Sequence, residues 1–220
     1  VNTREYKEYH KGRKSYIMPM YLKRDAIRFI EASVSAISMA VAALGMPRRY
    51  DFREVAAENA VAIGLAGVAA ELSMSAVIVQ AQGEDALKFP TGFYKTGSHI
   101  VDDFKKLVGS QIPKMMFLTQ GIEEPSAHIA KLLEMASKLK LLTKLRAGGL
   151  HAGRGPSMDV SIACVNDVIA FISLLGASSR IKSYVDTLPK PIIITKSYDL
   201  IVDELIQKIA QSNTTLEKVS

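Results

Sequence analysis

Apolar residues recur at helical spacing along most of this chain, and the clearest run lies between residues 23 and 44. Its apolar positions follow one another at intervals of three or four: Ile27, Ile30, Val34, Ile37 and Val41. Side chains spaced in this way lie on one face of a helix. Asp25 in the first turn suits the helix dipole, and Gly45 and Pro47 then end the helix.

The same reasoning predicts further helices. We expect them at about 54–82, 98–108, 126–145 and 158–175, with a short one within 112–118. Glycines and prolines punctuate the segments between them. Few aromatic residues, no Trp and much Ala, Ser, Leu and Ile favour packed helices over a β-sandwich. The fold class that follows is all-α: a bundle of about five to six helices with a short mixed C-terminal extension.

The bundle is expected to occupy residues 23–188. A basic, Tyr-containing N-terminal arm, residues 1–22, precedes it. Residues 189–220 follow as a connector or docking element, with a short strand expected at Ile192 to Ile194 and an amphipathic helix at Asp199 to Ala210. Ser126 and Ser157 are the side chains we expect to cap the fourth and fifth main helices, because Ser oxygens accept from the first free backbone N–H groups.

The single cysteine, Cys164, lies in an apolar run and is interpreted as buried filler. One cysteine allows no internal disulfide, which fits a reducing, cytoplasmic compartment. His99 and His128 have no partner at metal-ligand spacing, so we expect neither a metal nor another cofactor. The formal net charge of +6 permits contact with a polyanion but does not require it.

Residues 60–79 are apolar over nearly the length that spans a bilayer. Glu71 lies in the middle of this run, and a carboxylate there is unfavourable in lipid. We therefore expect a helix buried inside the bundle and no membrane partner. A membrane-associated helical protein is the alternative.

A glycine-rich segment after the fourth main helix carries the sharpest chemical signal. Arg146 and His151 stand five residues apart, with Gly148 and Gly149 between them. On one straight helix, five residues turn through about 140°, so the two side chains would diverge. A break at the two glycines would remove that constraint, and both side chains could then face one cleft.

Arginine and histidine suffice for cutting RNA without a metal. Histidine titrates near neutrality and can remove the proton of a 2′-hydroxyl, while arginine donates to phosphate oxygens on which charge develops. The product would carry a 2′,3′-cyclic phosphate. Lys144 and Arg154 flank the pair and are candidates for RNA binding at neighbouring phosphates.

This motif resembles the Arg-x(4–6)-His motif of the HEPN superfamily, in which it lies late in a helical bundle. The resemblance covers roughly residues 23–180. It implies a metal-independent endoribonuclease acting as a toxin or phage-defence effector, with Arg146 and His151 as catalytic residues. It also implies RNA as substrate, a homodimer with two facing Arg/His pairs, and control by an antitoxin or regulatory domain.

The alternative is a non-catalytic helical module that dimerises or binds RNA or a protein. Ala147, which stands where many active HEPN motifs have a polar residue, is compatible with it. In that case Arg146 caps its helix end and His151 is a turn residue. A second match to the motif, Arg4-x5-His10, lies in the polar arm and lacks a helical context.

Overall fold

The computed structural model describes the backbone of residues 21–45, 52–110, 116–152 and 156–193 of the 220-residue chain, and the side chains of these residues except those of 52–57 and 144–152. Over the described residues the protein is all-α, with six α-helices and no strand, as the sequence predicts. Lys88 and Tyr94 form an isolated antiparallel bridge within a loop.

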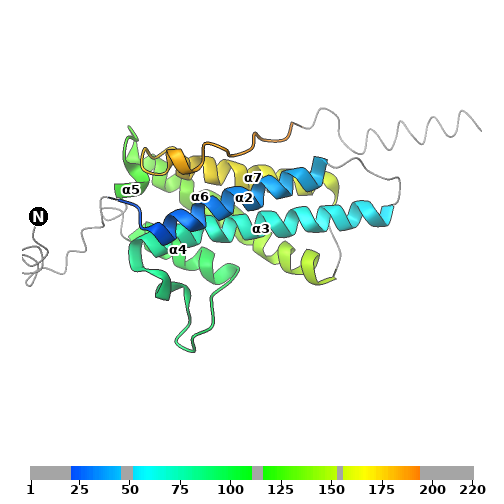
Figure 1. The fold of residues 1–220 in the computed structure, drawn as a ribbon, viewed down its shortest axis with the longest axis horizontal. Coiled ribbons are helices and arrows are strands. Elements are labelled where there is room, and N and C mark those ends of the chain that lie inside the picture. Colours follow the sequence, from blue (N-terminus) through cyan, green and yellow to red (C-terminus); the bar gives the residue numbers. More distant parts are fainter. Residues whose placement is uncertain (1–20, 46–51, 111–115, 153–155, 194–220) are drawn as a thin grey trace, which may run out of the picture.

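The helices form a bundle around one long central member (Figure 1). In chain order the elements are α2 (Arg24–Gly45), α3 (Phe52–Gln82), the 3-10 turn η1 (Glu84–Leu87), α4 (Ser98–Ser110), α5 (Met116–Thr119), α6 (Pro125–Ala152), α7 (Met158–Gly176) and the 3-10 turn η3 (Lys182–Tyr184). The central helix is α3, which packs against α2, α4, α6 and α7.

Small side chains allow α3 to be central. Ala62, Ala66, Ala69 and Ala70 are buried along it, so neighbouring helices approach its backbone closely. Larger side chains fill the space between the outer helices. Phe104 of α4 and Phe171 of α7, for example, meet edge to face with their ring centroids 5.7 Å apart. A helix that is apolar all round is expected at the centre of such a bundle.

The predicted helix boundaries are mostly close to those observed. Ser157 caps α7 as predicted, accepting a hydrogen bond from the Val160 backbone N–H. The predicted cap at Ser126 is wrong, because α6 already begins at Pro125, where the fixed φ of proline suits the first turn. α3 ends as predicted before Gly83, whose φ of 90° is accessible to glycine.

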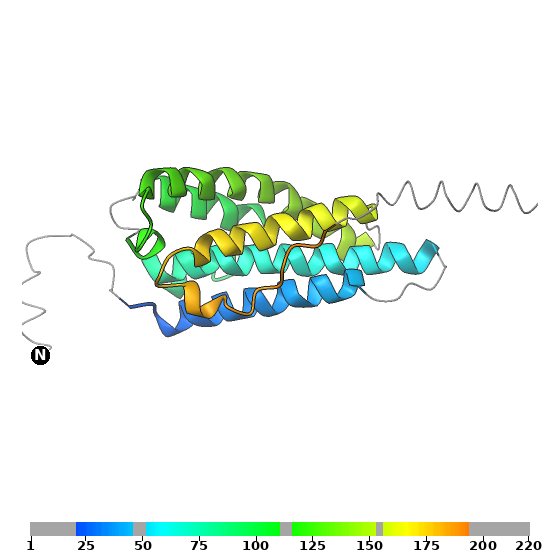
Figure 2. The same cartoon turned by 90° about the horizontal axis from the view of Figure 1, so that it is seen from above.

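The chain after α7 turns back along the bundle between α7 and α2 (Figure 2). Asn166 of α7 holds it there through two hydrogen bonds. The Asn166 side chain donates to the Ile192 carbonyl at 2.9 Å and accepts from the Ile192 N–H at 2.8 Å. Ile192 and Ile193 are not in a strand, so the expected short strand is not formed at these two residues. The expected helix after 199 and the N-terminal arm up to residue 20 lie outside the described residues.

Candidate functional site

The structure corrects the expected arrangement of the Arg146/His151 pair. α6 is one continuous helix from Pro125 to Ala152, with no break at Gly148-Gly149. Both residues of the pair therefore lie in its last two turns, at backbone positions about 140° apart around the helix axis. Their side chains, like that of Lys144, belong to the part of α6 for which only the backbone is described, and Arg154 lies outside the described residues.

The two glycines fail to end α6 because their effect is small. Each weakens a helix by roughly 1 kcal/mol relative to alanine. α6 packs along α3, α4 and α7, and its inner face buries Leu132, Leu139 and Leu142. Burial of one such side chain is worth about 1.5–3 kcal/mol. The helix continues through both glycines as far as Ala152, so a local preference of this size does not end it.

The motif end of α6 lies where α3 and α7 begin. Asn59, near the start of α3, donates from its side-chain amide to the carbonyl of Pro156 at 3.0 Å. Pro156 lies between the end of α6 and the start of α7, so this bond ties the chain after the motif to the central helix. Figure 2 shows the three helix ends together at one end of the bundle.

Two buried side-chain oxygen atoms at this end have no hydrogen-bond partner among the described residues. Asn59 is 3% exposed, and its Oδ1 accepts no hydrogen bond from the described residues. The buried Oε2 of the adjacent Glu58 is in the same condition. A buried acceptor left in this state is unfavourable by about 1–3 kcal/mol, so polar groups of this kind call for a physical explanation. Sequence reasoning missed both, although Glu58-Asn59 is a polar pair in an apolar helix.

The two histidines and the cysteine whose side chains are described, His99, His128 and Cys164, do not come together in a catalytic or metal-binding cluster. His99 is exposed and packs edge to face on Phe89. His128 is buried, and desolvation lowers the pKa of its ring. A backbone hydrogen bond with Leu118 acts in the opposite direction, but its effect on the pKa is smaller. Cys164 is half-buried and packs on the core, and burial raises the pKa of its thiol. Among the described residues no three His, Cys, Asp or Glu side chains come together as a metal site would require.

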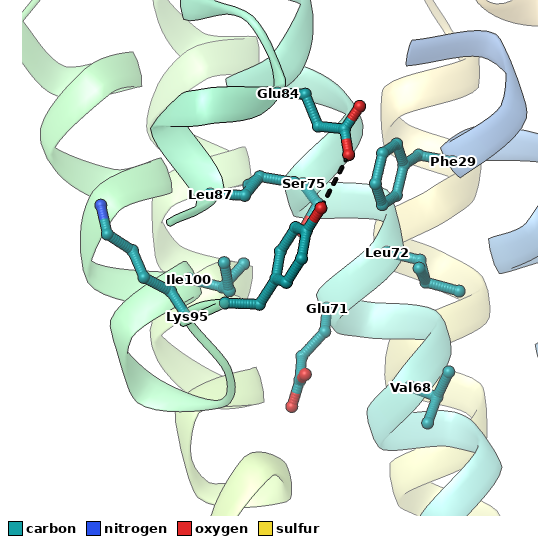
Figure 3. Close-up of a pocket in the computed structure, with 10 residues that line it drawn as sticks. Phe29, Val68, Glu71, Leu72, Ser75, Glu84, Leu87, Lys95 and Ile100 are labelled. Carbon is teal, nitrogen blue, oxygen red and sulfur yellow. Dashed lines mark hydrogen bonds between the residues drawn. The ribbon is translucent and has the colours of Figure 1, made fainter. Parts of the chain in front are cut away.

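A pocket of about 340 Å³ lies elsewhere on the bundle, between α2, α3, α4 and the loop after α3 (Figure 3). Its walls mix apolar and polar side chains: Phe29, Val68, Glu71, Leu72, Ser75, Glu84, Leu87, Tyr94, Lys95 and Ile100. Sequence reasoning did not find it. The sequence indicates the pocket only in part, because Glu71 and Ser75 are polar residues beside Val68 and Leu72 in an otherwise apolar helix.

Three helices among the described residues are long and apolar enough to cross a membrane, judged by length and composition alone. The share of this apolar stretch that is buried inside the protein is 72% in α3 and 44% in each of α2 and α7. Residues 60–79 thus form the interior helix that Glu71 suggested.

Comparison of the chain with protein-family models, curated proteins and solved structures gave no match. The HEPN resemblance therefore remains an expectation from the Arg146-x4-His151 motif of the sequence.

Proposed function

We propose that this chain is a metal-independent endoribonuclease in which Arg146 and His151 act on RNA. The observation that carries the proposal is the position of the pair, in the last turns of a long helix late in an all-α bundle. The anchored Asn59–Pro156 contact supports it, because a catalytic pair needs a fixed backbone around it.

The proposed reaction is a transesterification within the RNA chain. His151 takes the proton of a 2′-hydroxyl, whose oxygen forms a bond to the adjacent phosphorus while the bond from phosphorus to the 5′-oxygen breaks. Arg146 donates to the phosphate oxygens that gain charge. The departing 5′-oxygen takes up a proton, and the other fragment ends in a 2′,3′-cyclic phosphate. Lys144 and Arg154 bind neighbouring phosphates.

The continuous course of α6 determines how the pair would meet. Because the two positions are about 140° apart on one helix, a single chain does not present both on one helix face. We therefore propose a homodimer in which Arg146 of one copy acts with His151 of the other. A twofold interface would create two such sites.

The first test is cleavage of a labelled single-stranded RNA by the purified chain in the presence of EDTA. We expect cutting that yields cyclic phosphate ends, identified by fragment mass, and its loss in His151→Ala and Arg146→Ala. His99→Ala and Arg28→Ala change exposed residues elsewhere and serve as matched controls that should still cut. Cutting that survives His151→Ala would reject the assigned base.

The second test mixes the two inactive variants. In a statistical mixture of Arg146→Ala and His151→Ala, about half of the dimers contain both variants, and each of these holds one intact composite site of two. We expect recovery of about a quarter of the wild-type rate. A mixture as inactive as its components, alongside an active wild type, would place both residues of a working pair on the same copy.

The continuous helix also favours a second candidate, a non-catalytic module that binds RNA or a protein through the same end of the bundle. A folded wild type that binds RNA but leaves every RNA tested uncut would support this function and reject the nuclease. Activity as a toxin or defence effector, and control by an antitoxin, would follow from the nuclease function and not from this second one.

A further inference from the structure

The loop between α3 and α4 contains a short hairpin, residues 87–95, with a defined backbone. Lys88 and Tyr94 pair across it in the isolated bridge. The Phe93 carbonyl accepts from the N–H of Phe89 at 2.8 Å, and the Phe89 carbonyl accepts from the N–H of Gly92 at 2.8 Å. Gly92 closes the turn with a φ of 87°, a conformation that suits glycine. Hydrogen bonds therefore fix the tip of this hairpin, which Figure 1 shows projecting from the side of the bundle.

The hairpin presents two aromatic rings to solvent, and they differ in what already covers them. Successive residues of an extended chain point to opposite sides, so the rings of Phe93 and Tyr94 lie on two faces of the hairpin. Lys88 lies over the Tyr94 ring, 5.5 Å from its centroid, and the Tyr94 hydroxyl donates to Glu84. The ring of Phe93 is 77% exposed. Phe93 is therefore the ring that is available to a flat partner.

The root of the hairpin is fixed to the bundle. Leu87 is 3% exposed and belongs to the core. The Phe89 ring meets His99 of α4 edge to face, with the ring centroids 5.1 Å apart, and Lys95 forms an ion pair with Asp103 of α4 at 2.8 Å. A ring on such a support binds a partner with little further loss of conformational freedom.

The hairpin leads into α4 beside the helix that carries the motif. Gly97, directly before α4, lies against α6, because a Cβ on it would be 3.8 Å from the Cβ of Thr143. Arg146 is three residues further along α6, and Phe93 is four residues before Gly97. Taking about 1.5 Å per helical residue and at most about 3.6 Å per extended residue, the backbone positions of Phe93 and Arg146 are no more than about 30 Å apart.

The charges around the hairpin are largely paired. Three carboxylates near it form ion pairs with lysines: Asp85 with Lys88 at 3.0 Å, Asp103 with Lys95 at 2.8 Å, and Asp102 with Lys140 at 2.7 Å. A fourth, Glu84, accepts from the Tyr94 hydroxyl at 3.0 Å. A polyanion would therefore not meet a row of uncompensated carboxylates here, and its contact with the hairpin would depend on stacking more than on charge.

We propose that Phe93 is a stacking platform for a base of single-stranded RNA whose backbone continues to the Arg146/His151 end of α6. Aromatic rings that bind single strands stack on bases of any sequence. A separation of at most about 30 Å corresponds to about nine stacked nucleotides at 3.4 Å each, within the 4–16 or so that single-strand sites cover. The inference rests on the proposed function for the identity of its ligand.

The direct test uses fluorescence, because the chain has no Trp and Phe93→Trp adds a single fluorescent ring at the tip. The probe is a single-stranded RNA of about 12 nucleotides, a length typical of such sites, with every 2′-hydroxyl methylated so that the proposed reaction cannot cut it. We expect the probe to quench the fluorescence, and the same RNA as a duplex not to. Met116→Trp, at a residue 72% exposed on α5, is the matched control that should not be quenched. Bound RNA that leaves the fluorescence of Phe93→Trp unchanged would overturn the proposal.

The second test measures affinity for the same probe by fluorescence anisotropy of a dye on the RNA. Phe93→Ala should weaken binding about 5- to 150-fold, which corresponds to about 1–3 kcal/mol for one stacked base, and Met116→Ala should leave binding unchanged. Equal affinity of Phe93→Ala and the wild type would reject the platform.

The platform and the nuclease can fail separately, because the probe cannot be cut. A wild type that cuts RNA but binds the probe without help from Phe93 refutes only the platform. A wild type that leaves RNA uncut but stacks the probe on this ring refutes only the nuclease, and a chain that does not bind the probe refutes the platform. Fluorescence of Phe93→Trp that responds to phosphatidylcholine vesicles or to protein concentration, and not to RNA, would assign the hairpin to a lipid surface or to a second copy instead.

Discussion

The corner between α7 and the returning chain allows a sharp test of the packing. Gly176 is the last residue of α7, and a Cβ built on it would lie 2.2 Å from Cγ2 of Val185. Carbon atoms in contact are normally about 3.5–4.0 Å apart. Val185 has a stiff, branched side chain that cannot simply swing away, so we expect Gly176→Ala to strain this corner.

The size of the effect follows from two opposing contributions. An extra methyl forced into a packed site is unfavourable by about 1–3 kcal/mol, while replacing a helical glycine by alanine gains up to about 1 kcal/mol. The clash should win, because Gly176 is at the helix end and gains less than an interior residue. We expect the free energy of unfolding to fall by about 1–2 kcal/mol, measured by urea denaturation followed by circular dichroism.

A double-mutant cycle provides the decisive control. Val185→Ala removes Cγ2 and leaves Cβ at 3.5 Å from the added methyl, an ordinary contact. The double variant should be as stable as Val185→Ala alone, which gives a coupling energy of about 1–2 kcal/mol. Gly109→Ala in α4 has room, with the nearest atom at 3.9 Å, and should be neutral or stabilising. A Gly176→Ala variant as stable as Gly109→Ala, with no coupling to Val185, would refute the reasoning.

Three further predictions concern single polar groups. Asn166→Ala removes both hydrogen bonds to the Ile192 backbone and should lower the free energy of unfolding by about 1–3 kcal/mol, with faster proteolysis of the chain after α7 as the second readout. Because burial lowers the pKa of His128 below its ordinary value, the unfolded chain takes up a proton more readily, so this residue's contribution to stability should be lost as the pH falls below about 6.5. Replacing His128 by Gln should make the fall in stability from pH 7.5 to pH 5 shallower, and an unchanged slope would contradict this. Asn59→Ala should reduce RNA cleavage while the protein stays folded by circular dichroism, and full cleavage would exclude a positioning role for its bond to the proline carbonyl.

The periodicity of apolar residues was sufficient to predict the class of fold and most helix boundaries. It works for α2, where a strong apolar stripe ends at Gly45, and for α7, where the Ser157 cap marks the start of the helix. It fails at the end of α6, where the sequence offers two glycines but the helix continues to Ala152. Local preference of this size is overruled by tertiary packing.

The candidate sites were harder to predict, for different reasons. The Arg146/His151 pair is visible as a motif, but its arrangement depends on whether α6 continues past Gly149. The pocket depends on the fold of the loop between α3 and α4, which no periodicity describes. The partner of Asn166 is 26 residues away along the chain, and a single polar residue in an apolar helix does not identify a distant backbone partner.

The buried polar side chains of α3 indicate where on this helix a functional site is expected. α3 is enclosed by four other helices, so each polar side chain within it must be desolvated, which costs about 1–3 kcal/mol where no partner is found. Alanine or leucine would avoid that cost and would suit the packing. The Oδ1 atom of Asn59, next to the chain that follows the motif, has no such partner among the described residues, whereas Ser73 and Gln80 of the same helix have hydrogen-bond partners within the protein. Polar residues on an enclosed helix mark the places where local rules for a stable core are set aside, and such places are expected at functional sites. The region of α3 around Asn59 is therefore the part of this helix in which function is best sought.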